Sequence, residues 1–138
     1  MPQWVRQAAA ISLLDGTICL VTSSSGRRWV VPKGMIDPGD TAGETALKES
    51  WEEAGLSGTL QPEPVGTYVY EKYNTLHHVT VFVLDIAEVH DEWPESQRRE
   101  RRFYSTSEAL ERIEEEGLRE IIERSTRSLP RESQMTSY

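Results

Sequence analysis

Residues 34–56 read GMIDPGDTAGETALKESWEEAGL, and they carry more structural information than any other stretch of the chain. The first seven of them contain two glycines and a proline, so residues 33–40 are predicted to form a loop. Thr41 is a suitable helix N-cap, and Glu44 three residues later completes a capping-box pattern. Gly55 is typical of the residue that follows a helix. The sequence therefore predicts a loop followed by a helix that ends at Gly55.

Three glutamates lie on one side of this predicted helix. Each helical residue turns by about 100°, so Glu49, Glu52 and Glu53 share a sector of roughly 100°. Their mutual repulsion weakens an isolated helix by about 0.2–0.5 kcal/mol per pair, but a divalent cation such as Mg²⁺ would bind to the carboxylates and to substrate phosphates. The alternative is a solvated acidic face, since the chain has 23 acidic residues. The sector predicted to face the core holds Ala46, Leu47, Ser50 and Ala54.

Outside this segment, β-forming runs alternate with turn signals. Asp15-Gly16 predicts a hairpin turn, and Asn74 marks a second turn region. The predicted strands cover 8–14, 18–21, 29–31, 67–70, 78–86 and 99–104, and the later helices cover 108–115, capped by Ser105 or Thr106, and 118–124, with a possible break at Gly117. The order of elements predicts an α+β fold, an α/β/α sandwich with a mixed central sheet. We expect a single domain over 1–129 and a flexible tail over 130–138.

The bulk composition excludes several classes of protein. A length of 138 residues predicts one domain, and a net charge of -8 disfavours broad nucleic-acid binding while leaving room for a local anion pocket. Cys19 is the single cysteine, so no intramolecular disulfide can form, and its apolar neighbours predict burial. No apolar run reaches the ~20 residues of a membrane span, and the first residues lack signal-peptide features. We therefore expect a cytoplasmic protein without membrane partners.

The spacing within residues 34–56 resembles the motif of the Nudix family. In that motif a Gly is followed after five residues by Glu, after seven more by Arg-Glu, and then by an aliphatic residue, any residue, Glu-Glu, any residue, Gly and an aliphatic residue. This chain keeps the spacing, with Asp40 in place of Glu, Lys48 in place of Arg and Ser50 in place of the aliphatic residue. Because the family uses the first Glu and the Arg to steady the loop, and lysine cannot form a bidentate fork, we expect a somewhat looser loop.

The resemblance implies the Nudix fold and a pyrophosphohydrolase that uses Mg²⁺ or Mn²⁺ to cut a phosphoanhydride bond. It assigns metal binding to a backbone carbonyl near Gly34 and to the glutamate cluster, with Glu49 and Glu53 as the principal ligands and Glu52 beside them. Glu52 is the expected general base, and Glu53 is the alternative. The metal would neutralise the leaving phosphate and lower the pKa of a bound water, and the carboxylate would accept its proton.

Other segments resemble the branch that hydrolyses diphosphoinositol polyphosphates and diadenosine polyphosphates. They are the serines before Arg28, the aromatic strand before His77-His78, and the Asp91-Glu92-Trp93 segment with the arginines after it. A phosphate chain needs several cations, and arginine pairs with phosphate bidentately. The predicted phosphate contacts of this small-molecule substrate are Arg6, Arg28, Lys33, His78, Arg99 and Arg101. If residues 99–104 form a strand, its two odd-numbered arginines share one face.

Three alternatives stay open from the sequence. An enzyme of the same fold could act on ADP-ribose, on a nucleoside triphosphate or on RNA 5′ ends. The substitutions at positions 40 and 48 leave room for a binding module that has lost turnover. A structural protein without any ligand is the third alternative, and a Mg²⁺-dependent change in thermal stability would argue against it.

Overall fold

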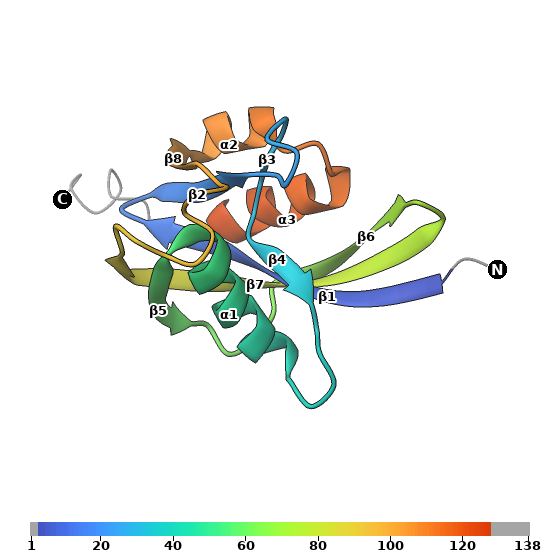
Figure 1. The fold of residues 1–138 in the computed structure, drawn as a ribbon. Helices are drawn as coiled ribbons and strands as arrows, with labels where there is room; N and C mark the ends of the chain where they lie inside the picture. Colours follow the sequence, from blue (N-terminus) through green and yellow to red (C-terminus); the bar gives the residue numbers. More distant parts are fainter. Residues whose placement is uncertain (1–2, 128–138) are drawn as a thin grey trace.

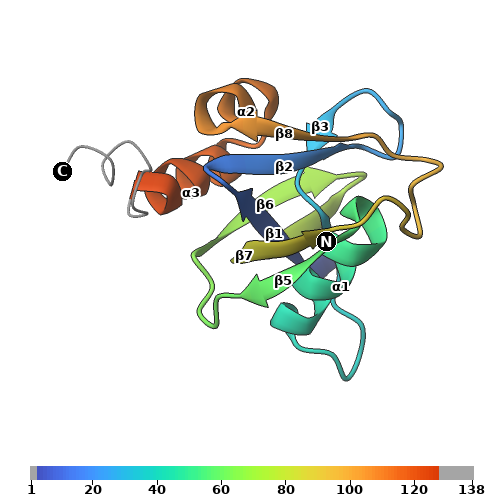
Figure 2. The ribbon, with the colours of Figure 1, turned by 90° about the vertical axis from the view of Figure 1, so that its left-hand side faces the viewer.

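A computed structural model describes residues 3–127 and shows helices on both faces of a mixed β-sheet (Figure 1). Helix α1 (Ala42–Ala54) covers one face, and α2 (Thr106–Arg112) and α3 (Glu116–Arg127) cover the other (Figure 2). This arrangement confirms the α/β/α sandwich of the α+β class. The predicted tail, residues 130–138, lies outside the described residues. Within residues 3–127, no helix is long and apolar enough to cross a membrane.

The sheet has eight strands, and its two longest strands run parallel through the centre. The strands are β1 (Gln3–Leu14), β2 (Thr17–Thr22), β3 (Trp29–Val30), β4 (Lys33–Met35), β5 (Leu56–Leu60), β6 (Gly66–Lys72), β7 (Thr75–Val89) and β8 (Arg101–Ser105). The main order is β3-β2-β1-β7-β5, while β4 pairs with β1, β6 with β7 and β8 with β2. Because β1 and β7 pair over almost the whole length of β1, they form the platform from which the other elements extend.

Two tight turns close the hairpins of the sheet, and the sequence predicts both of them. Asp15 and Gly16 have φ angles of 49° and 79° between β1 and β2. Tyr73 and Asn74, at the tip of the β6–β7 hairpin, have φ angles of 51° and 57°. Positive φ at both residues of a two-residue turn matches the twist of antiparallel strands. The second hairpin extends beyond the helices (Figure 1).

The core is divided into two parts by the sheet. Ala8 and Ala10 of β1 pack in the cluster under α1, whereas Ala9 and Ile11 pack in the cluster under α2 and α3. Successive strand side chains point to opposite faces, so a strand covered on both sides needs a continuous apolar run. Full burial of a side chain such as Ile11 stabilises the fold by about 1.5–3 kcal/mol. Cys19 is also fully buried, as expected.

Helix α1 has the predicted ends. The Thr41 hydroxyl accepts from the Glu44 N–H at 3.1 Å, and the Glu44 carboxylate accepts from the Thr41 N–H at 2.8 Å. Gly55 has a left-handed φ of 66° and ends the helix. The prediction for Leu47 was wrong, because this side chain is 38% exposed. The buried stripe of α1 is narrow and is made of Thr45, Ala46, Ser50, Glu53 and Ala54.

The structure differs from the sequence prediction in several boundaries and in two additional strands. Residues 33–40 are not loop throughout, because β4 pairs with β1. Strand β5 follows α1 directly and was missed. Its sequence contains Gly58 at a register shift against β7, which weakens the local strand signal. The last strand begins at Arg101 and the last helix at Glu116, so Arg99 lies in a loop and the helical break precedes Gly117.

Candidate active site

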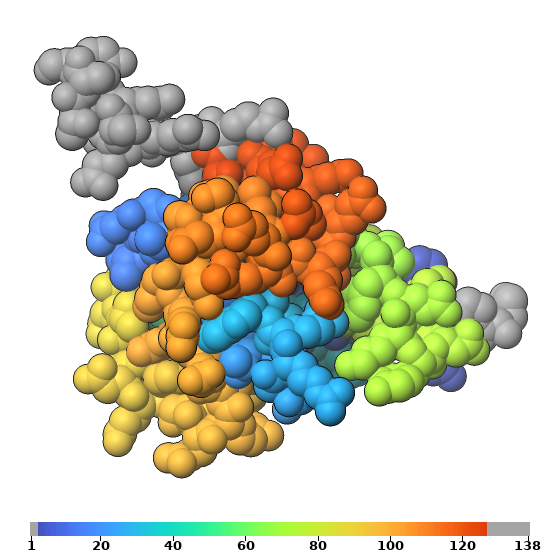
Figure 3. Space-filling view, turned by 90° about the horizontal axis from the view of Figure 1, so that it is seen from above, coloured from blue at the N-terminus to red at the C-terminus, as the bar shows by residue number. Residues whose placement is uncertain are grey.

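A cleft of about 430 Å³ lies beside the C-terminal half of α1. Figure 3 shows parts of its surroundings: the loop after β2 in light blue, the region of α2 and α3 in orange, and the β6–β7 hairpin in lime. Its walls carry both signs of charge. The charged lining residues are Arg28, Lys33, Lys72 and Arg99 on the cationic side and Glu53, Glu71 and Glu115 on the anionic side. Uncharged lining residues include Gln7, Ser23, Ser24, Tyr70 and His77.

Two of the three motif glutamates meet where α1 borders this cleft. Glu53 is only 7% exposed, and its carboxyl group lies close enough to that of Glu49 for each to shift the pKa of the other. Desolvation by burial raises the pKa of Glu53 to about 8; the Arg99 charge opposes the rise, and the Glu49 charge adds to it. Desolvation and the charge of Glu52 also raise the pKa of Glu49. Carboxyl groups this close favour either a shared proton or a bound cation.

Gly34 brings the backbone of β4 against this pair. A Cβ built on Gly34 would lie 2.5 Å from Cδ of Glu49, so a larger residue would collide with the carboxyl group. Pairing of Gly34 with Ala8 of β1 holds the strand in this position. The glycine therefore allows the backbone of β4 and a helix carboxylate to lie side by side.

The donors at this point are all oxygens and fit a hard divalent cation. Across residues 3–127, no three His, Cys, Asp or Glu side chains are gathered closely enough to hold a metal ion alone, so Glu52 does not complete a preformed cage with the pair. Mg²⁺ usually binds through one or two carboxylates and completes its shell with water and substrate phosphate. Glu49, Glu53 and the backbone at Gly34 could supply the protein's part of such a shell.

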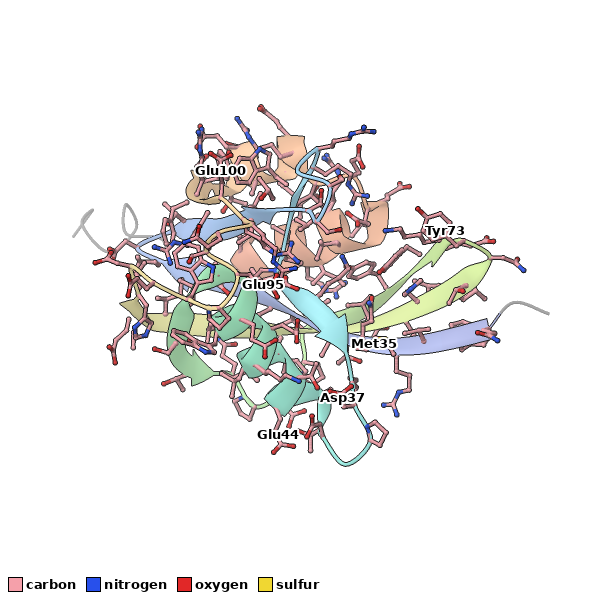
Figure 4. All side chains as sticks on the ribbon, viewed as in Figure 1. Met35, Asp37, Glu44, Tyr73, Glu95 and Glu100 are labelled. Atoms are coloured by element: carbon pink, nitrogen blue, oxygen red, sulfur yellow. The ribbon has the colours of Figure 1, made fainter. Side chains whose placement is uncertain are left out.

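Glu53 is held in place by contacts from two other elements. The backbone N–H of Lys33 donates to Glu53 Oε1 at 3.3 Å, and Arg99 Nη2 lies 3.5 Å from Glu53 Oε2. Arg99 also donates to Glu95 Oε1 at 2.7 Å and to the Thr22 carbonyl at 2.7 Å. The guanidinium therefore ties α1 to β2 and to the loop that carries Glu95, which Figure 4 shows near the C-terminal end of α1.

The same loop caps the C-terminus of α1, where the last turn has no basic residue. The backbone N–H of Glu95 donates to the Glu52 carbonyl at 3.0 Å, and Trp93 Nε1 donates to the Glu53 carbonyl at 3.0 Å. Arg101 Nη1 donates to the Ala54 carbonyl at 2.7 Å, and its guanidinium lies 4.2 Å from the Trp93 ring centre. These bonds satisfy three carbonyls that a helix end leaves unpaired.

The loop before α1 is tied to the helix by an unexpected partner. Lys48 Nζ lies 3.3 Å from Asp37 Oδ2, so Asp37, which the sequence did not single out, links the loop to the helix. Asp40 instead donates its backbone N–H to the Asp37 carbonyl at 3.0 Å. Figure 4 shows Asp37 in this loop, between β4 and Glu44 at the start of α1. One aspartate therefore organises both the turn and the link to the helix.

The predicted phosphate contacts divide into two groups. Arg28, Lys33 and Arg99 line the cleft. The other three do not: Arg6 and His78 lie opposite each other on β1 and β7, and Arg101 is engaged with the end of α1. His77 lines the cleft instead of His78, because neighbouring strand residues face opposite sides.

The cleft also contains residues that the sequence did not single out. The ring of His77 stacks on Tyr70 at 4.5 Å and 7°, and Lys33 Nζ lies 5.4 Å from the Tyr70 ring centre. Desolvation lowers the pKa of Lys33. Lys72 and Glu115 complete this part of the lining. An alternation count along β6 and β7 could have found Tyr70 and His77 together, but Glu115 precedes a helix and carries no comparable signal.

Comparison with known proteins agrees with this geometry. The chain matches the NUDIX domain family over residues 4–125. It is 32% identical over 108 residues to Nudix hydrolase 4 of Arabidopsis thaliana, covering 77% of this chain and 52% of the relative. It is 30% identical over 99 residues to diphosphoinositol polyphosphate phosphohydrolase 2 of Homo sapiens, covering 70% and 53%. The chain thus spans about half the length of the curated relatives it matches.

A solved structure shows the same fold. The Ap4A hydrolase of C. elegans superposes with a TM-score of 0.75 at 20% sequence identity, covering 94% of this chain and 100% of that chain. At this identity the likeness concerns the fold. The family match extends from β1 to α3 and includes the loop and helix that carry the glutamates. This chain therefore belongs to the Nudix family.

Proposed function

We propose that this chain is a Mg²⁺-dependent pyrophosphohydrolase that cuts a phosphoanhydride bond in a phosphate-rich small molecule. The observation that carries the proposal is the Glu49–Glu53 pair, in which Glu53 is buried and Glu49 is partly buried, packed against Gly34 at a cleft that is also lined by arginine and lysine. Metal-binding oxygens beside phosphate-binding cations form the combination that phosphoryl transfer needs. Mn²⁺ is the expected substitute for Mg²⁺.

In this proposal Glu49 and Glu53, with a backbone carbonyl near Gly34, would hold the ion. When bound, the ion supplies neutralisation of phosphate charge and a lowered pKa for water. Glu52 does not join Glu49 and Glu53 in a cluster and is the proposed general base, with Glu53 as the alternative. Arg99 orients Glu53 through their 3.5 Å contact, and Arg28 and Lys33 receive the phosphates.

For the substrate, we propose a diadenosine polyphosphate or a diphosphoinositol polyphosphate. The human relative is named for diphosphoinositol polyphosphate, and the C. elegans hydrolase is named for Ap4A. The four cationic side chains of the cleft support a polyphosphate ligand in general. ADP-ribose, nucleoside triphosphates and RNA 5′ ends stay alternatives for the same site. The cytoplasmic location stays a prediction.

A substrate panel with Mg²⁺ tests the proposal. We expect a diadenosine polyphosphate or an inositol pyrophosphate to give the highest kcat/KM. The variants Glu52→Gln and Glu53→Gln should lower turnover by at least about a hundredfold, which is the usual contribution of a positioned acid or base. The matched control is Glu120→Gln on the exposed side of α3, which should behave as the parent.

The possible outcomes separate the hypotheses. A clear preference for ADP-ribose or a nucleoside triphosphate would make the substrate assignment wrong while leaving the chemistry intact. Equal residual rates in the parent and in Glu53→Gln, with retained ligand binding, would indicate a binding module. Absence of Mg²⁺-dependent turnover on every member of the panel would contradict the proposal.

A further inference from the structure

Glu115 places a carboxylate on the side of the cleft where Arg28 and Lys33 are proposed to bind phosphate. It lies in the connection between α2 and α3, directly before α3 begins, and it lines the cleft with Arg28 and Lys33. Its side chain is 14% exposed and accepts a bond from Arg28 Nη2 at 2.8 Å. A largely shielded negative charge among phosphate-binding cations opposes the binding of an anion, so its presence there needs an explanation.

Arg28 also contacts Glu114, the residue before Glu115, but this second carboxylate is far more exposed to solvent. Arg28 Nε lies 2.9 Å from Glu114 Oε2, but the Glu114 side chain is 65% exposed and does not line the cleft. Exposed ion pairs contribute little and are screened by solvent. Either acid can anchor the arginine, and only Glu115 places its charge where a ligand would lie.

The charge of Glu115 reaches beyond its direct partner. Lys33 of β4 and Tyr70 of β6 line the same cleft as Glu115. Glu115 also contributes to the raised pKa of Tyr70, after the larger effects of burial and of the bond to Gln7. The negative charge of Glu115 therefore faces groups of β4 and β6, which form other walls of the cleft.

We propose that Glu115 limits the negative charge of the ligand that the cleft accepts, and so determines specificity for phosphate-chain length. It neutralises part of the charge of Arg28 and Lys33 and repels each additional phosphate. Four cationic side chains and three carboxylates line the cleft, so removal of one carboxylate substantially changes the net charge of the lining. This inference rests on the proposed function only in taking a phosphate chain as the ligand.

Binding of two inorganic anions tests the role of Glu115 without requiring turnover. We would measure the Kd of pyrophosphate and of tripolyphosphate by calorimetry, with Mg²⁺ present, for the parent and for Glu115→Gln. Loss of one charge at this range is expected to tighten tripolyphosphate binding by about fivefold and pyrophosphate binding by about twofold. The ratio of the two constants is the decisive quantity, because a general change in folding would alter both equally.

Glu114→Gln is the matched control, since it removes the other ion pair of Arg28 without altering the charge of the cleft. It should keep the parent's ratio. If Glu115→Gln does not fold, Glu115→Ser provides a second neutral variant, because serine is favoured immediately before a helix. Equal ratios in parent and neutral variants, equal shifts in the Glu114 and Glu115 variants, or no binding of either anion would overturn the inference.

Measurements of hydrolysis distinguish a failure of the role inferred for Glu115 from a failure of the proposed function. If the substrate panel shows no turnover but Glu115→Gln changes the binding ratio, the role of Glu115 stands and catalysis does not. If turnover is present but Glu115→Gln keeps the parent's binding ratio, the proposed function stands and the role of Glu115 does not.

Discussion

At the scale of single residues, Glu53 has a carboxyl group that is almost fully buried although cation binding requires its charged form. Burial raises its pKa from 4.5 to about 8 in the metal-free fold, so the folded state holds the proton more tightly than the unfolded state. The stabilisation of the folded state by this bound proton is fully present below pH 4.5 and is lost as the pH rises through about 8. Because glutamine cannot ionise, the variant Glu53→Gln does not lose stability in this way as the pH rises.

We therefore predict that Glu53→Gln raises the melting temperature in EDTA at pH 8.5, and does so much less at pH 4.5. Each kcal/mol should appear as roughly 3–4 °C for a domain of this size. Thermal unfolding followed by circular dichroism at the two pH values provides the measurement. The same shift at both values would mean that the effect does not come from the ionised carboxylate.

Gly34 is the residue whose replacement should affect metal use most selectively. In Gly34→Ala the new Cβ would lie 2.5 Å from Glu49 Cδ, so either the carboxyl group or β4 must move. We expect a rise of at least about tenfold in the Mg²⁺ concentration for half-maximal activity, equivalent to about 1.4 kcal/mol of lost binding.

Gly43→Ala is a suitable control for this variant, because it lies within α1 and its Cβ would meet the flexible end of Leu60 at 3.3 Å and the Phe82 ring at an ordinary contact distance of 3.9 Å. The substitution favours the helix by up to about 1 kcal/mol. A Mg²⁺ titration in which both variants match the parent would contradict the assigned role of Gly34.

At the scale of elements, the loop from His90 to Arg99 positions the end of α1. Trp93 Nε1 supplies the bond to the Glu53 carbonyl, and phenylalanine cannot replace it. We predict that Trp93→Phe lowers the free energy of unfolding by about 1–3 kcal/mol, the cost of an unpaired buried carbonyl together with lost packing. Trp4→Phe, at a side chain that is 61% exposed, should change it little, and equal losses in denaturant titrations would refute the capping role.

The elements also show which features the sequence can predict. The ends of α1 depend on residues three or four positions apart, such as Thr41 and Glu44, so they are readable from local patterns. Strand β4 depends on pairing with β1, more than twenty positions away, and its three residues carry no strand signal of their own. Nonlocal pairing therefore accounts for the missed strands.

The same distinction applies to the candidate site. The spacing of Glu49 and Glu53 locates the carboxylate pair, because a helix fixes which side chains meet. His77 was passed over for His78, since an error of one position on a strand reverses the face. Arg99 was expected beside Arg101 on one strand, but a loop directs it to Glu53. Metal-side residues follow from helical geometry, whereas substrate-side residues depend on how distant elements pack.

At the scale of the whole molecule, the cleft joins elements that are far apart in the chain. Its walls come from the loop after β2, from α1, from the β6–β7 hairpin and from the α2–α3 connection. A ligand that contacts all of them binds the folded state and not the unfolded chain. Binding energy at this site therefore becomes stability of the entire domain.

We predict that Mg²⁺ together with a slowly hydrolysed polyphosphate analogue raises the melting temperature of the parent protein. At a ligand concentration of one hundred times Kd the gain is about 2.7 kcal/mol, which a thermal shift assay resolves easily. Glu49→Gln should lose most of this gain, since it removes one carboxylate of the Glu49–Glu53 pair, whereas Glu120→Gln should retain it. A parent protein with no shift at saturating Mg²⁺ and analogue would favour a structural role, because a cleft that binds neither partner cannot stabilise the fold.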